Sequence, residues 1–223
     1  MTMKTLIEPV LNALNSRLEP LGFKRNKYGR VWNRMIENYI DIIELQKSGF
    51  SNSLTVNCGV SCMDVYRITW GKEPKKIMIP AEGIVEIRLG HLVYGKDTWW
   101  EYEEILDSPG ILIDPVMSGG VSFCEKMHSE NEIMSSLEKE RFLPACRRLE
   151  YVVLLCKHGE KKKAEELINK KKVDYMKVML RLEYKTEEKF YNREVGLWDI
   201  RLKEIEQKYG LSIIHDLRKL YSL

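Results

Sequence analysis

The chain has 223 residues, a formal net charge of +3, 44% hydrophobic residues and 31% charged residues. This is the composition of an ordinary globular protein, and no run approaches the ~18 consecutive apolar residues that a membrane span requires. The composition therefore argues against a membrane-spanning protein. The small positive excess argues against a dedicated nucleic-acid binder, which typically has a pI above ~9.

Residues 1–20 carry spaced apolar side chains interrupted by polar ones, unlike the continuous apolar core of a signal peptide. This pattern predicts a cytoplasmic protein. The five cysteines are odd in number and scattered, and most have apolar neighbours. Such cysteines favour reduced, buried thiols over a disulfide framework.

The first predicted element is a helix. Leucine, isoleucine and valine recur at three- and four-residue spacing up to Leu18, and the regular part is expected to begin near Glu8. Pro20 and Gly22 follow directly and end the helix. Its apolar stripe predicts that one side of the helix packs on a core.

Four predicted strands come next. Segments 30–35 and 39–47 are rich in β-branched and aromatic residues and flank Glu37-Asn38, which predicts a hairpin. Residues 53–60 and 84–89 alternate apolar with polar side chains, as half-buried strands do. The short and moderate connections favour an antiparallel sheet, with the first helix covering its apolar face.

Turn-forming residues become scarce in the second half of the chain. Eleven of the 14 glycines and six of the seven prolines precede residue 121. Residues 108–122 contain two prolines and three glycines, which predicts a loop or linker. Before this segment, Asp97 is predicted to be a helix N-cap. Short helices are predicted after the loop, at 130–143, 144–158, 160–172, 174–185, 187–195, 197–209 and 212–221.

These elements predict an α+β fold with an N-terminal antiparallel sheet of about four strands covered by helix, followed by an all-helical C-terminal half. The expected organisation is a sheet domain at 1–107 and a linker or loop at 108–129. Residues 130–223 then form a helical bundle or an array of helical hairpins.

Three segments together resemble a known family: LEPLGFKR at 18–25, IELQKSGFSNSLTVNCGV at 43–60 and IRLGHLVYGKDTWW at 87–100. Their order and spacing resemble a bacterial family known only as a domain of unknown function (DUF 4304-like), over the first half of the chain. Leu54 stands where the family has phenylalanine, and the His-Trp pair that often precedes Arg-Leu-Gly is absent. The resemblance implies the fold and a bacterial cytoplasmic setting, without a reaction.

Polar and aromatic residues on or beside the strands form the leading candidate for a ligand or partner site. They can converge on a recognition surface where the sheet meets Trp99 and Trp100, or they can hold turns and strand ends by bonding to backbone. The two tryptophans cannot both face the same way, so at most one belongs deeply to the core. The candidates are Gln46, Lys47, Ser48, Asn57, Glu86, Arg88, Asp97, Trp99 and Trp100.

Two looser patterns also have ordinary structural explanations. Cys58 and Cys62, with Cys124 and His128, have a spacing that some zinc sites share, but Cys58 lies on the apolar face of its strand, and we expect no metal. Lysines flank the predicted helix 160–172, where glutamates intervene as on a solvated helix face. The basic residues concerned are Arg147, Arg148, Lys157, Lys161, Lys162, Lys163, Lys170, Lys171 and Lys172.

Familiar enzyme motifs are absent from the sequence: no Walker loop, GxGxxG, HExxH or GxSxG is present, so neither a catalytic residue nor a cofactor is predicted. We expect a non-catalytic protein-binding module, for example one resembling an immunity protein or antitoxin, because sheet and helical surfaces suit partner peptides or helices. The alternative is an enzyme with an unrecognised polar site on the sheet domain. Weak nucleic-acid binding through the C-terminal basic helix ranks third, and the oligomeric state is left open.

Overall fold

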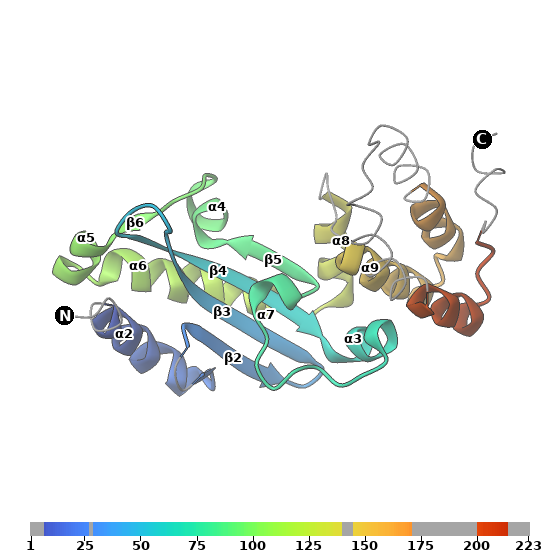
Figure 1. Cartoon of the computed structure of the whole chain (residues 1–223), viewed down its shortest axis with the longest axis horizontal. Helices are drawn as coiled ribbons and strands as arrows, with labels where there is room; N and C mark the ends of the chain where they lie inside the picture. The colour runs from blue at the N-terminus through green and yellow to red at the C-terminus, as the bar shows by residue number, and fades with distance from the viewer. Residues whose placement is uncertain (1–6, 27–28, 140–144, 171–199, 214–223) are drawn as a thin grey trace, which may run out of the picture. The chain divides into compact units, whose positions relative to one another are not determined.

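The computed structural model describes residues 7–26, 29–139, 145–170 and 200–213 (Figure 1). The chain divides into two compact units. The first contains residues 1–64 and 74–139, and the second contains residues 65–73 and 140–223. The second unit therefore includes a short segment from the N-terminal half of the sequence.

The first unit contains the predicted antiparallel sheet. Its strand order is β1-β2-β3-β4-β5, and β6 pairs separately with β4. The predicted hairpin is confirmed, because Ile36 pairs with Tyr39 across Glu37-Asn38. The strands are β1 (Lys24–Arg25), β2 (Val31–Ile36), β3 (Tyr39–Lys47), β4 (Ser53–Cys62), β5 (Val85–Arg88) and β6 (Trp100–Glu101).

The hairpin turn strains one residue. Glu37 has a φ of 51°, in the left-handed region that costs a non-glycine residue about 1–2 kcal/mol. We expect Glu37→Gly to raise the free energy of unfolding by about 0.5–1 kcal/mol, after the extra freedom of glycine in the unfolded chain is subtracted. Urea denaturation measures the change. Glu37→Ala keeps the strain, so an equal gain from alanine would contradict this explanation.

Helices pack around the sheet. The first predicted helix is confirmed, and Gly22, with a φ of 88°, lies just after it. The helical elements of the first unit, including the start of α3, are α2 (Glu8–Leu18), η1 (Glu19–Leu21), α3 (Met63–Trp70), η2 (Pro80–Glu82), α4 (Leu89–Tyr94), α5 (Tyr102–Asp107), α6 (Gly110–Pro115), the π-helix η3 (Val116–Val121), α7 (Ser122–Lys126) and α8 (Glu130–Lys139).

The loop predicted at 108–122 is wrong, because this segment is largely helical. Leu112 and Val116 are fully buried, and burying such side chains outweighs the poor helix propensity of the glycines. Gly120 also permits a close approach to the sheet: a Cβ there would lie 3.0 Å from the Cys58 Sγ. The glycines that suggested a turn thus allow a helix to pack tightly.

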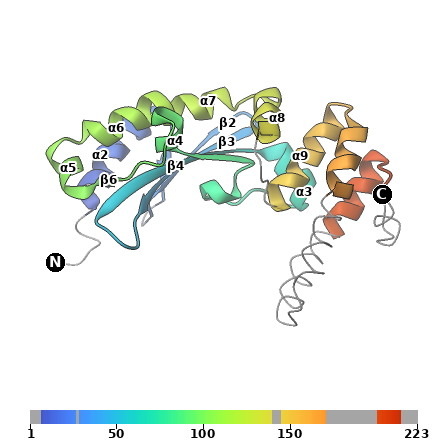
Figure 2. The same cartoon turned by 90° about the horizontal axis from the view of Figure 1, so that it is seen from above.

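One side of the sheet, here called the helix face, is covered by α2, α6 and α7 (Figure 2). The register aligns Trp32, Ile43 and Cys58 across β2, β3 and β4 on this face. All three side chains are fully buried, and the Trp32 Nε1 donates a hydrogen bond to Asn15 of α2 at 3.0 Å. The sequence thus correctly placed the first helix over the apolar side of the sheet.

The opposite side is called the strap face because residues 74–84 cross it. Asn33 fastens this strap: its side chain accepts from the Met78 N–H and donates to the Met78 carbonyl, both at 3.0 Å. Thr55 and Ser61 on this face of β4 have no exposed surface. The strand predicted to be half-buried is therefore buried on both faces along most of its length.

The second unit is helical where it is described. Its helices are α3, α9 (Ala145–Lys157), 161–170 and 200–209. Arg201 donates hydrogen bonds to the carbonyl groups of Ile68 and Thr69 at 2.8 and 2.7 Å, and so caps the end of α3. The helices predicted at 174–185 and 187–195, and most of 212–221, lie outside the described residues. No helix in the described ranges combines the length and apolarity that a membrane crossing needs.

Candidate functional site

The segment that follows β5 folds back over that strand. Gly95, with a φ of 69°, ends α4, and the chain returns through residues 96–99 toward β4. Gly90 permits this path, because a Cβ at this position would lie only 2.5 Å from the Thr98 backbone nitrogen. The Thr55 hydroxyl then donates to the Thr98 carbonyl at 2.9 Å and fixes the returning segment.

Arg88, at the end of β5, is the centre of the polar contacts that this turn creates. Its Nη1 donates to the Asp97 Oδ2 at 2.7 Å, and its Nε donates to the Asn57 Oδ1 at 3.4 Å. The guanidinium lies over the Trp99 ring, 5.1 Å from its centroid, and the Trp99 Nε1 donates to the same Asp97 oxygen at 3.3 Å. Arg88 is thus oriented on three sides while its side chain stays 29% exposed.

Asn57 connects this group to the neighbouring strand. Its Nδ2 donates to the Gln46 Oε1 at 2.8 Å and, with a longer contact of 3.4 Å, to Glu44. We call Gln46, Asn57, Arg88, Asp97 and Trp99 the Arg88 cluster. The structure therefore brings together five of the nine predicted site residues, on the strap face of the sheet.

The other four predicted residues have different positions. Ser48 holds the β3–β4 turn by accepting from the Phe50 and Ser51 N–H groups, and Lys47 pairs with Leu54 on the helix face. Trp100 is buried, with 7% exposure. Glu86 is exposed on the strap face, two residues before Arg88. The candidate surface is therefore smaller than the sequence suggested.

Asp97 does not cap a helix, so that prediction is wrong. Residues 100–101 form a strand, and α5 starts only at Tyr102. The Asp97 carboxylate instead accepts hydrogen bonds from Arg88 and Trp99. The opposite orientations predicted for Trp99 and Trp100 are nevertheless found. They arise from strand alternation at β6, because Trp100 pairs with Leu54 on the helix face.

The hydrogen bond from Arg88 lowers the pKa of Asp97 below its ordinary value. A carboxylate with a lowered pKa keeps its stabilising contact above the unfolded-state pKa and loses it as the pH falls through the folded-state pKa. We therefore expect the Arg88–Asp97 pair to persist at pH values where ordinary aspartates, with a pKa of about 3.9, are half protonated. NMR titration of the Asp97 carboxyl carbon measures this. Arg88→Gln should move the midpoint back up, and an unshifted midpoint in the unmodified protein would contradict the assignment.

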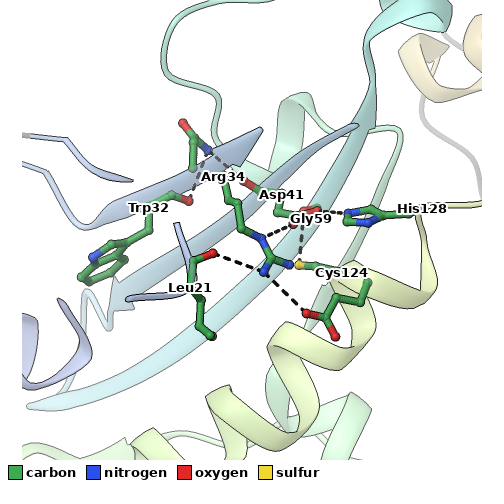
Figure 3. Close-up of polar contacts among 9 residues, drawn as sticks. Leu21, Trp32, Arg34, Asp41, Gly59, Cys124 and His128 are labelled. Carbon is green, nitrogen blue, oxygen red and sulfur yellow. Dashed lines mark hydrogen bonds and ion pairs between the residues drawn. The ribbon is translucent and has the colours of Figure 1, made fainter. Parts of the chain in front are cut away.

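A second polar network, which the sequence analysis missed, lies on the helix face (Figure 3). Asp41 is fully buried and accepts from the Arg34 Nε at 2.8 Å. Its other oxygen lies 2.7 Å from the Nε2 of His128, which follows α7. The network therefore joins β2 and β3 to the end of the covering helix.

Arg34 is 6% exposed and makes further contacts at the edge of this network. Its Nη1 lies 3.5 Å from both the Leu21 carbonyl and Glu125, and its guanidinium lies over the Phe23 ring. The His128 ring stacks on Tyr39 at 5.1 Å. The hairpin pattern contained a usable signal, because pairing across Glu37-Asn38 places residue 34 opposite residue 41. Buried, mutually paired charges of this kind make a local structural anchor.

The zinc pattern is not brought together as a metal site. Burial raises the pKa of Cys58 to about 12 and that of Cys124 well above its ordinary value, which keeps both as neutral thiols at pH 7. Within the described ranges, no three His, Cys, Asp or Glu side chains are placed to share a metal ion.

Comparison with known families supports the resemblance of the first half of the chain. The family model described as Domain of unknown function (DUF4304) matches residues 14–113. The matched segment contains the whole Arg88 cluster together with Arg34 and Asp41, whereas His128 lies beyond it. Neither a curated protein nor a solved structure matches the chain.

Proposed function

We propose that the protein is a non-catalytic protein-binding module whose contact surface is centred on the Arg88 cluster. The observation that supports this most directly is the Arg88–Trp99 pair, which is held in one geometry by Asp97 and Asn57 and is partly exposed. Tryptophan and arginine are the residues most often found at the energetic centre of protein interfaces. A pair already ordered in the free protein loses less side-chain entropy on binding.

The same geometry argues against acid–base catalysis at this cluster. A general base or acid works best when its pKa is near the working pH. The Arg88 hydrogen bond lowers the pKa of Asp97, which makes this carboxylate a weak base. The cluster side chains also bond to one another, as expected of a surface fixed for recognition. The second candidate function is an enzyme, because several polar side chains lie on or beside these strands. Its active site would be centred on Gln46, Lys47, Asn57, Glu86 and Arg88.

Nucleic-acid binding is the third candidate. Of its proposed basic residues, Lys161, Lys162, Lys163 and Lys170 lie in the described helix 161–170, and Lys163 forms an ion pair with Glu160 at 3.6 Å. The side chains of Arg147 and Arg148, and residues 171–172, lie outside the described residues.

The protein-binding proposal includes a role like that of an immunity protein or antitoxin. In that role the partner would contact the sheet surface.

Affinity capture tests the proposal, with the full chain as bait, cell extract as source and nuclease added. We expect a stoichiometric protein partner that survives nuclease and is lost with Trp99→Ala. The matched control is Leu106→Ala, which removes an apolar side chain of 43% exposure outside the cluster and should retain the partner. A partner retained equally by both variants would overturn the proposed surface, and turnover of a substrate that is lost on Arg88→Gln would favour the enzyme reading.

A further inference from the structure

Carboxylates lie on the strap face around the Arg88 cluster. The strand positions on this face carry Glu44, Glu86, Arg88 and Glu101, as the pairing of β3, β4, β5 and β6 shows. Arg88 is neutralised locally by Asp97 at 2.7 Å. Beside the cluster, the strand positions therefore add the carboxylates of Glu44 and Glu101.

Two of these carboxylates are available to a ligand on the present geometry. Glu101 is exposed, and Glu44 is half-buried and, among the described residues, accepts the long 3.4 Å contact from Asn57. Glu101 lies two residues after Trp99 on the same face, and Glu44 is linked to the cluster through Asn57. An aromatic ring with carboxylates around it attracts cations through both its quadrupole and their charge.

We infer that the Arg88 cluster and the carboxylates of Glu44 and Glu101 bind a basic, lysine- or arginine-rich segment of a partner protein. The inference rests on the proposed function and specifies the chemistry of the partner. The hydrocarbon stems of long basic side chains pack on aromatic surface while their charged ends reach carboxylates. The side chain of Phe50, at the tip of the neighbouring β3–β4 turn, is fully exposed and extends the apolar surface for those stems.

Charge complementarity excludes two other occupants. Nucleic acid is a polyanion and would be repelled by the same carboxylates. An acidic peptide would have to compete with Asp97, which already accepts from the Arg88 Nη1 at 2.7 Å. The carboxylates of Glu44 and Glu101 are thus the feature that selects the partner.

Peptide titration of the isotopically labelled full chain tests the inference. The probes are a peptide of alternating lysine, arginine and leucine and its counterpart with glutamate at every basic position. We expect the basic peptide to shift the Trp99 indole N–H signal, with an affinity that falls as salt is added. Glu101→Lys and Glu44→Lys should each weaken binding about tenfold, which corresponds to about 1.4 kcal/mol.

Glu132→Lys is the matched control, because it makes the same change in net charge on α8, where its side chain is 46% exposed. This substitution should change the affinity for the basic peptide by less than about twofold, because an exposed charge far from the binding site contributes little. Equal weakening by Glu132→Lys and Glu101→Lys would reduce the effect to non-specific attraction and overturn the inference. Equal binding of the acidic peptide, or concentration-dependent self-association of the chain through this face, would also overturn it.

The outcomes separate this inference from the proposed function. If a captured partner is lost with Trp99→Ala but binds more tightly to Glu101→Lys, the binding surface is correct and the basic partner is wrong. If the partner is unaffected by Trp99→Ala, the proposed surface itself fails. Loss of binding in both Trp99→Ala and Glu101→Lys supports both.

Discussion

Replacing Asp41 with asparagine is expected to lower the free energy of unfolding by about 3–5 kcal/mol. Asp41 has no exposed surface, and its partner Arg34 is 6% exposed. The asparagine fills the same space but leaves the Arg34 charge buried with only the longer, 3.5 Å contact to the largely exposed Glu125 carboxylate. Because removing one partner of a buried pair exposes the full cost of burying the other, the loss far exceeds that of one hydrogen bond. Urea denaturation of the full chain measures it.

The matched control is the ion pair between Arg67 and Glu73, which has a similar distance of 2.9 Å but side chains that are 42% and 74% exposed. Glu73→Gln should cost less than about 1 kcal/mol, because water screens and solvates exposed charges. Changing both buried residues, with Arg34→Met and Asp41→Leu, should recover most of the stability lost in Asp41→Asn. A loss in Asp41→Asn no larger than that in Glu73→Gln would show that Asp41 is not a buried anchor.

Replacing Gly90 with alanine is expected to disturb both stability and the Arg88 cluster. The added Cβ would lie 2.5 Å from the Thr98 nitrogen and 2.7 Å from the Lys96 carbonyl oxygen, and backbone atoms cannot rotate away as a side chain can. Overpacking of this kind costs about 1–3 kcal/mol, and more where backbone must move. Displacing residues 96–98 should also separate Asp97 from Arg88. Urea denaturation and the NMR signal of the Trp99 indole N–H report the two effects.

Gly49→Ala is the control for this substitution. No atom lies within 4 Å of a Cβ built at Gly49, so its stability change should stay within about 0.5 kcal/mol and the Trp99 signal should not move. The two glycines thus differ in the space around them. An unchanged Trp99 signal in Gly90→Ala would mean that the cluster does not depend on this close approach.

The strands could be predicted from the sequence because their pattern is local. The hairpin around Glu37-Asn38 and the alternation of 53–60 appear in the structure as β2–β3 and β4. The segment 108–122 was mispredicted because counting glycines and prolines ignores what their small size permits in packing. Leu112 and Val116, spaced four residues apart, were the helix signal in that segment.

The candidate site could be predicted only in part, for a geometric reason. Alternation places Asn57 and Arg88 on the polar sides of their strands, which the sequence shows directly. Their contact depends on the register between β4 and β5, which is set by tertiary packing. The position of Trp99 depends on the close approach at Gly90, for which no local pattern exists. Arg34 and Asp41 were missed because their burial depends on the helices that cover this face, which the strand pattern alone does not reveal.

The path of the chain between its two units bears on how the protein is made. Residues 65–73 belong with residues 140–223, although they lie between strands of the first unit. During synthesis α3 leaves the ribosome long before Glu150, which accepts from the Trp70 Nε1 at 3.1 Å, and before Arg201. Domains generally fold in the order of their synthesis. Here synthesis of the first unit is complete at residue 139, when residues 65–73 are the part of the second unit that has already been made. A nascent chain halted at residue 139 should therefore present α3 to chaperones until its later partners emerge.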